Sequence, residues 1–122
     1  MKKLLFSIKN AMNGITHVIS KHNNFRIMSV IATIVIVVGI LLRLNSIEWF
    51  FISWSIATVL IAEMVNTAVE HVINLIHKKR SIYAKLAKDV SAGAVLLSSI
   101  WAGLIGALIF IPKIIDFLRR FF

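Results

Sequence analysis

The apolar positions of the chain change from a helical stripe to long continuous runs. In the first 24 residues they recur at intervals of three and four, the stripe of an amphipathic helix, at Leu4, Leu5, Ile8, Ala11, Met12, Ile15, Val18 and Ile19. A signal peptide is the competing interpretation, but the apolar segment LLF is too short and no A-x-A-like cleavage site follows. We predict a helix over 1–24 that lies in the membrane interface.

Three longer apolar runs follow this segment. A spanning helix needs roughly 20 residues, and the first run, 25–43, reaches that length once its flanking arginines are included. The second, 47–77, contains no Gly or Pro before the basic run HKKR, and the third covers 89–111 before Pro112. Residues 112–122 form a basic tail. The pattern predicts one all-α integral-membrane domain over 1–122, with an interfacial helix and three transmembrane helices.

Composition and charge agree with a membrane protein. Hydrophobic residues make up 59% of the 122 positions, cysteine is absent and the net charge is +9. The basic residues flank the apolar runs, a pattern typical of contact with anionic headgroups. We therefore expect a bilayer partner and no nucleic acid.

The distribution of Lys and Arg predicts the orientation in the membrane. The N-terminal segment and the second linker each carry five Lys or Arg, and the first turn carries only Arg43. Both basic segments are predicted to be cytoplasmic, in the plasma (inner) membrane, although the basic tail runs against this rule.

Polar residues share one face of the second apolar helix. They lie at intervals i, i+3, i+4, i+7 and i+11, at Glu63, Asn66, Thr67, Glu70 and Asn74. The two carboxylates are about 10 Å apart along the axis, which suits two tasks at one site. Each acidic group near hydrocarbon costs roughly 2.5 to 3.5 kcal/mol, so the pair favours function over snorkelling or packing. For Asn66 and Thr67, hydrogen bonding between helices is an equal alternative.

The stretch AKLAKDVSAGAV places Lys88 and Asp89 at the start of the third span. Asp89 has the alternative role of helix N-cap. Further along, small residues recur every four positions in two rows, Ser99–Gly103–Ala107 and Ala102–Gly106. Such rows allow close helix contact, so a multi-helix or oligomeric bundle is expected.

Three motifs carry a resemblance to a known family. E-M-V-N-T-A-V-E at 63–70 is followed by A-K-D at 87–89 and A-G-A-V-L-L at 92–97. This combination resembles the small bacterial integral-membrane diacylglycerol kinase and undecaprenol kinase family, and the turn and tail resemble its Gram-positive branch. The resemblance implies a homotrimer, ATP and Mg²⁺ at the cytoplasmic interface, and a lipid alcohol that enters from the bilayer. The implied activity is an ATP-dependent lipid kinase acting on undecaprenol, or otherwise on diacylglycerol.

The resemblance also implies roles for individual residues. Glu63 matches the general base, Asn66 lies where it can orient the hydroxyl or a phosphate, and Glu70 matches a Mg²⁺ ligand. Lys88 and Asp89 match residues beside the phosphates. His22 and Asn74 depart from the family pattern, since both stand where carboxylates are expected. His22 as a metal ligand would weaken Mg²⁺ binding or favour Mn²⁺ or Zn²⁺, which leaves a catalytically weakened relative as an alternative.

The other histidines are given ordinary roles. His17 is expected to face solvent or headgroups, and His71 and His77 to contact lipid phosphate. No pair has a spacing that predicts a zinc site.

Two non-kinase functions compete with the lipid kinase. A holin-like pore former or regulatory subunit leaves the polar face unexplained. A proton-coupled transporter would place its carboxylate near the bilayer midplane, whereas here both lie towards one end.

Overall fold

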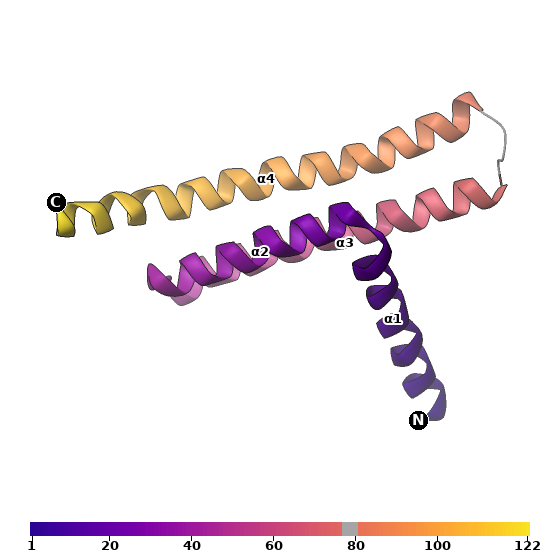
Figure 1. Ribbon diagram of the computed structural model, residues 1–122, viewed down its shortest axis with the longest axis horizontal. Helices are drawn as coiled ribbons and strands as arrows, with labels where there is room; N and C mark the ends of the chain where they lie inside the picture. The colour runs from indigo at the N-terminus through magenta and orange to yellow at the C-terminus, as the bar shows by residue number, and fades with distance from the viewer. Residues whose placement is uncertain (77–80) are drawn as a thin grey trace.

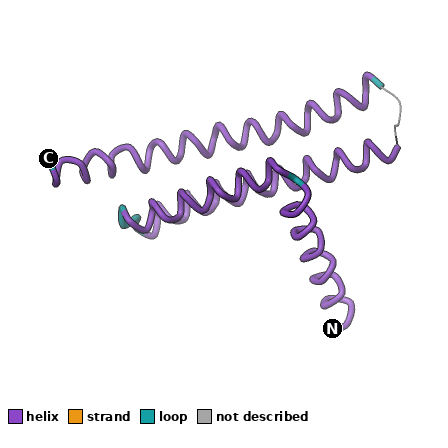
Figure 2. Tube along the Cα trace, in the orientation of Figure 1, coloured by secondary structure: helices purple, strands orange, loops and turns teal. Residues whose placement is uncertain are grey.

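The computed structural model describes residues 1–76 and 81–122, which form four helices (Figures 1 and 2). They are α1 (Lys2–Lys21), α2 (Asn23–Leu41), α3 (Ser46–Ile76) and α4 (Ile82–Phe121). The last three are long and apolar enough to cross a membrane. An all-helical chain with three candidate membrane spans is therefore confirmed.

The three long helices lie alongside one another, and α1 turns away from them (Figure 1). α4 packs along α3, and α2 packs on α3 as well. α1 contacts α2 and α3 near its C-terminal end, where Val18 is buried. The change of direction occurs at His22, whose extended backbone (φ −113°, ψ 110°) separates α1 from α2.

A Schellman motif ends α2. The Arg43 amide donates to the Ile40 carbonyl, and the Leu44 amide donates to the Gly39 carbonyl. Arg43 occupies the left-handed position at φ 54°, which glycine usually fills. Gly39 is required by close packing, because a Cβ there would lie 2.8 Å from Cη2 of Trp49. This motif sets the sharp reversal between α2 and α3.

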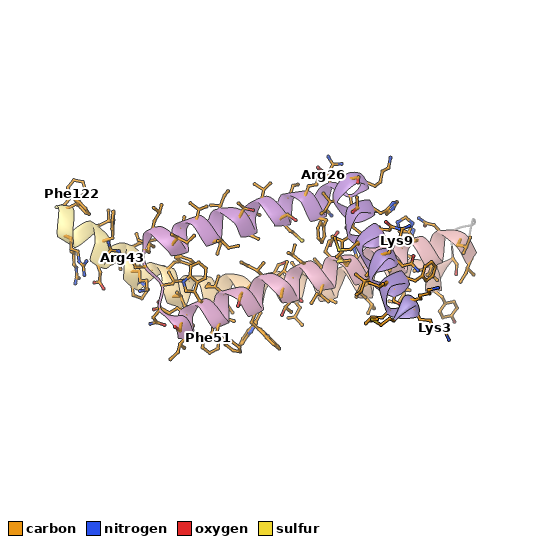
Figure 3. All side chains as sticks on the ribbon, turned by 90° about the horizontal axis from the view of Figure 1, so that it is seen from below. Lys3, Lys9, Arg26, Arg43, Phe51 and Phe122 are labelled. Atoms are coloured by element: carbon orange, nitrogen blue, oxygen red, sulfur yellow. The ribbon has the colours of Figure 1, made fainter. Side chains whose placement is uncertain are left out.

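A capping box begins α3. Asn45 Oδ1 accepts from the Glu48 amide (2.9 Å), and Glu48 Oε2 accepts from the Asn45 amide (2.8 Å). Lys113 of α4 lies 3.1 Å from the same Glu48 oxygen and also donates to the Arg43 carbonyl at 3.4 Å. Figure 3 shows Arg43 at the opposite end of α2 from Arg26 and Lys9. The α2–α3 turn and α4 are thus joined at the end of the bundle remote from α1.

Helix α4 extends beyond the bounds expected for the third span. It begins at Ile82, with Ser81 as its N-cap, and continues through Pro112 to Phe121. Asp89 lies inside the helix, so its alternative role as N-cap is wrong. The segment before Asp89 is rich in the helix formers Ala, Leu and Lys. Proline is tolerated within membrane helices because neighbouring groups satisfy the carbonyl that it leaves unbonded.

Burial within the chain is sparse and partly polar. The buried residues of α3 are Ile52, Ser55, Glu63, Asn66 and Thr67, whereas α4 buries only Val95 among the described residues. Large apolar side chains point outward along α2, α3 and α4. A polar seam inside an apolar exterior is the arrangement expected of a protein surrounded by lipid.

Candidate active site

The polar row of α3 turns inward at its first three positions. Glu63, Asn66 and Thr67 are 4%, 7% and 3% exposed, respectively. Glu70 is half-buried, and Asn74 is exposed near the helix end. The helical period places all five on one face, and the packing of α4 against α3 covers the deeper part of it.

Asn66 is fixed by α4. Ser91 Oγ donates to Asn66 Oδ1 at 2.8 Å. Because the Asn66 carbonyl oxygen accepts this bond, its amide N–H groups are the part that can donate to a bound molecule. Ser91 was missed by the sequence reasoning. A signal was present, since Lys88, Ser91 and Val95 lie at i, i+3 and i+7 and therefore share one face of α4.

Lys88 and Asp89, which were expected to act together, have different partners in the structure. Lys88 Nζ crosses to α3 and donates to Asn74 Oδ1 at 2.8 Å. Asp89 instead accepts from Lys85 Nζ at 2.7 Å, one turn earlier in α4, and both side chains are exposed. Lys88 therefore lies beside the outer end of the polar row, while Asp89 is held along its own helix.

Glu63 is a buried carboxylate without a protein donor in the part of the chain that the structure describes. No hydrogen bond or ion pair joins it to residues 1–76 or 81–122, yet its oxygens are not fully enclosed. A buried carboxylate without donors is costly. A ligand hydroxyl that reaches these oxygens would supply the missing hydrogen bond, so the position suits binding of an alcohol.

An open apolar groove of about 580 Å³ is formed by the three long helices. It runs between α2, α3 and α4, and its α3 wall extends from Ile52 to Leu60, which is three residues before Glu63. The two small-residue rows of α4 form the opposite wall. Glycine and alanine leave room there, because a Cβ added at Gly103 or Gly106 would meet nothing within 4 Å.

Three histidines meet where α1, α2 and α3 come together. His22 Nε2 and His71 Nε2 are 3.3 Å apart, and one ring nitrogen from each of His17, His22 and His71 lies within 4.8 Å of the others. The spacing of the histidines along the sequence did not predict this cluster. The spacing argument failed because it considered neighbours along one helix, whereas His22 and His71 are 49 positions apart. His77 lies outside the described residues.

The described residues thus combine an apolar groove among three candidate membrane spans with a buried carboxylate and a buried amide on α3, features that suit an integral-membrane protein acting on a lipid. Residues 9–110 match the family of prokaryotic diacylglycerol kinases. The chain is 36% identical over 114 residues to undecaprenol kinase of Bacillus subtilis, covering 93% of each protein. It is 34% identical over 114 residues to diacylglycerol kinase of Synechocystis sp., covering 93% of this chain and 65% of that protein.

The chain belongs to the prokaryotic diacylglycerol kinase family, and it is a lipid kinase. The resemblance seen in the three sequence motifs is confirmed. Family membership favours an enzyme over a pore former or a transporter, and it implies ATP and usually a divalent metal as cofactors.

Proposed function

We propose that this lipid kinase transfers the γ-phosphate of ATP to a polyprenol, undecaprenol in preference to diacylglycerol. The observation that carries the proposal is the buried Glu63 carboxylate, which has no donor among the described residues. The apolar groove formed by the three long helices, whose α3 wall reaches Leu60, would hold the lipid tail. The match to undecaprenol kinase of B. subtilis over 93% of both chains supports the choice of alcohol.

In this proposal the lipid tail lies in the groove and its hydroxyl reaches Glu63. The hydroxyl oxygen attacks the γ-phosphorus, the bond between that phosphorus and the bridging oxygen of ADP breaks, and Glu63 takes the hydroxyl proton. Asn66, fixed by Ser91, donates its amide N–H to the hydroxyl or to a phosphate oxygen. The protein contributes mainly position and charge, as phosphoryl transfer requires.

The phosphates would lie at the outer end of the polar row. Lys88 supplies a positive charge there. Asp89, which pairs with Lys85 along α4, is assigned to the same site only by the family resemblance. The half-buried Glu70 fits Mg²⁺, which is commonly held by one or two carboxylates together with substrate phosphates. When bound, Mg²⁺ would neutralise phosphate charge. The imidazole of His22 does not fit Mg²⁺, and it leaves Mn²⁺ or Zn²⁺ as metals for that side chain.

The setting of this site is also part of the proposal. α1, with apolar residues along one face and lysines along the other, lies on the cytoplasmic surface of the plasma membrane. The polar end of α3 and the start of α4 then face the cytoplasm, where ATP is found. The protomers form a homotrimer, a proposal that rests on the family resemblance and is supported by the two rows of small residues on α4, which allow close helix contact.

The test is a transfer assay on purified protein in detergent, with labelled ATP and Mg²⁺ and with undecaprenol or diacylglycerol supplied separately. We expect Glu63→Gln and Glu70→Gln each to lower turnover at least about 100-fold, because a general base or a metal ligand is lost. Asp116→Asn, the same change of acid to amide at an exposed site of α4, should keep wild-type turnover.

Two outcomes would count against the proposal. Equal turnover of Glu63→Gln and Asp116→Asn would exclude Glu63 as the base, and faster phosphorylation of diacylglycerol would reverse the substrate assignment. A wild-type protein that binds ATP but phosphorylates neither lipid would establish the weakened relative, which the replacement of carboxylates by His22 and Asn74 favours.

A further inference from the structure

We propose that His17, His22 and His71 form a binding site for a transition-metal ion that joins the surface helix α1 to the membrane helix α3. His17 and His71 take no part in the phosphoryl-transfer reaction proposed above, and His22, which does not fit the catalytic Mg²⁺, joins them here in a separate cluster. It does not depend on the identity of the lipid substrate.

The three imidazoles form a nearly regular triangle. Their ring centroids are separated by 5.8 Å (His17 to His22), 5.5 Å (His17 to His71) and 5.4 Å (His22 to His71). The rings are inclined to one another by 58°, 59° and 78°, so they do not stack. Inclined rings around a common centre allow one nitrogen of each to point inward, as metal ligation requires.

The distances suit a tetrahedral ion. Two Zn–N bonds of about 2.0–2.1 Å at the tetrahedral angle place the two nitrogens about 3.3–3.4 Å apart. His22 Nε2 and His71 Nε2 already lie 3.3 Å apart. The other ligand atoms lie within 4.8 Å, and the exposed His17 ring can close the remaining gap by rotation about its own side-chain bonds.

The backbone explains why these residues meet. His22 has an extended conformation between α1 and α2, so its ring leaves the surface of both helices. The buried Val18 and Phe25 pack on either side of this corner. The corner is therefore held by apolar contacts that do not require the metal, and the histidines are brought together before any ion binds.

The ligand set selects the class of metal. Imidazole suits Zn²⁺, Co²⁺, Ni²⁺ and Cu²⁺, whereas Mg²⁺ and Ca²⁺ prefer oxygen. Three histidines with a fourth position left for water form a known type of zinc site. Glu70, the carboxylate next to His71 in the chain, is not a member of the cluster formed by described residues. The site should therefore bind Zn²⁺ or Co²⁺ in the presence of excess Mg²⁺.

The simpler interpretation is a hydrogen bond between His22 and His71, with His17 merely nearby. Co²⁺ titration distinguishes the two, because tetrahedral Co²⁺ has strong visible absorption that a hydrogen bond cannot produce. The full-length protein in detergent, without ATP or lipid alcohol, is titrated with Co²⁺ in excess Mg²⁺, and Zn²⁺ is then added as competitor. We expect one ion per chain and loss of the absorption when Zn²⁺ displaces Co²⁺.

Variants identify the ligands. His17→Ala, His22→Ala and His71→Ala should each weaken binding at least about tenfold, as loss of a metal-ligating side chain does. Ser20→Ala, an exposed change in the same turn of α1, should bind as the wild type does. Zn²⁺ should also slow proteolysis of α1 in the wild type and leave its rate unchanged in His71→Ala, because α1 is then no longer joined to α3.

Equal Co²⁺ affinity in the wild type and in both His17→Ala and His71→Ala would overturn the site, as would octahedral Co²⁺ absorption that Mg²⁺ abolishes. If His22→Ala fails to fold, the other two variants, which change exposed positions, decide the question. Failure of this site would leave Mg²⁺-dependent lipid phosphorylation unaffected, so the two proposals are judged by separate measurements.

Discussion

At the scale of single residues, the candidate site depends on one contact between helices. Ser91 holds Asn66 by its carbonyl oxygen and thereby fixes the direction of the amide N–H groups. Ser91 acts on the site by holding Asn66 and is not itself assigned a contact with the substrate, so we regard it as a positioning residue. Its effect on the reaction should pass through Asn66.

We predict that Ser91→Ala lowers kcat about fivefold and leaves KM for the lipid nearly unchanged, because a neutral hydrogen bond of about 1 kcal/mol is lost. Ser91→Thr keeps the hydroxyl and should restore most of kcat. Steady-state kinetics with varied lipid concentration provide the measurement. A fall in KM alone, or equal loss in the Ala and Thr variants, would contradict a positioning role.

The residues on α3 could be predicted from sequence because they follow from the helical period. Charge and amides at intervals of three, four and seven within an apolar run must share a face, and Glu63 and Asn66 were found in this way. Ser91 and the grouping of His22 with His17 and His71 were not found, because these contacts depend on how helices distant in the sequence are aligned. No local pattern encodes that register, and His22 leaves its helix altogether.

At the scale of elements, the end of α2 contains a conformational cost. Arg43 takes the left-handed conformation that the Schellman motif requires, at a cost of roughly 1–2 kcal/mol for a residue with a side chain. Its carbonyl receives Lys113 from α4, so the turn also positions a second helix. The backbone, rather than the arginine side chain, makes these contacts.

Arg43→Gly should therefore stabilise the protein by about 0.5–1 kcal/mol, the difference between the left-handed cost and the extra entropy of unfolded glycine. Thermal or denaturant unfolding in detergent measures this change. Arg43→Ala removes the same side chain but keeps the Cβ, so it should give no gain. Equal stabilisation by both substitutions would show that the arginine charge, and not the backbone, is unfavourable.

The helix bounds show which local signals are strong. The expected second span, 47–77, is observed at Ser46–Ile76, where the Asn45–Glu48 capping box marks its start. The expected third span, 89–111, is observed within a helix from Ile82 to Phe121. The lysines before Asp89 resemble a linker when they are read only as charges, yet they lie on a segment of helix-forming residues. Charge marks the membrane boundary, and it does not mark the helix end.

At the scale of the whole molecule, one chain covers little of its own surface. α4 has 40 residues, about 60 Å at 1.5 Å per residue, and α3 has 31, about 46 Å. Both exceed the hydrocarbon thickness of about 30 Å. Their polar ends therefore project beyond the hydrocarbon, as the proposed contact of Lys88 and Glu70 with a water-soluble nucleotide requires.

We predict that the protein in mild detergent or lipid nanodiscs is a trimer. Native mass spectrometry should give a main species of three chains of 13.7 kDa each, about 41 kDa in total. Association should persist in Glu63→Gln, because that residue is enclosed within one chain. A monomer as the main species under conditions that preserve lipid phosphorylation would contradict the prediction.

The groove between α2 and α4 is open along its side, and this has a consequence for selectivity. A groove that is open along its side does not fix the length of the chain that lies in it. Isoprenoid alcohols of very different length should thus be accepted with similar efficiency once they are long enough to reach the bilayer, and discrimination should arise at the hydroxyl-bearing end, where the neighbouring atoms of the alcohol meet Glu63 and Asn66.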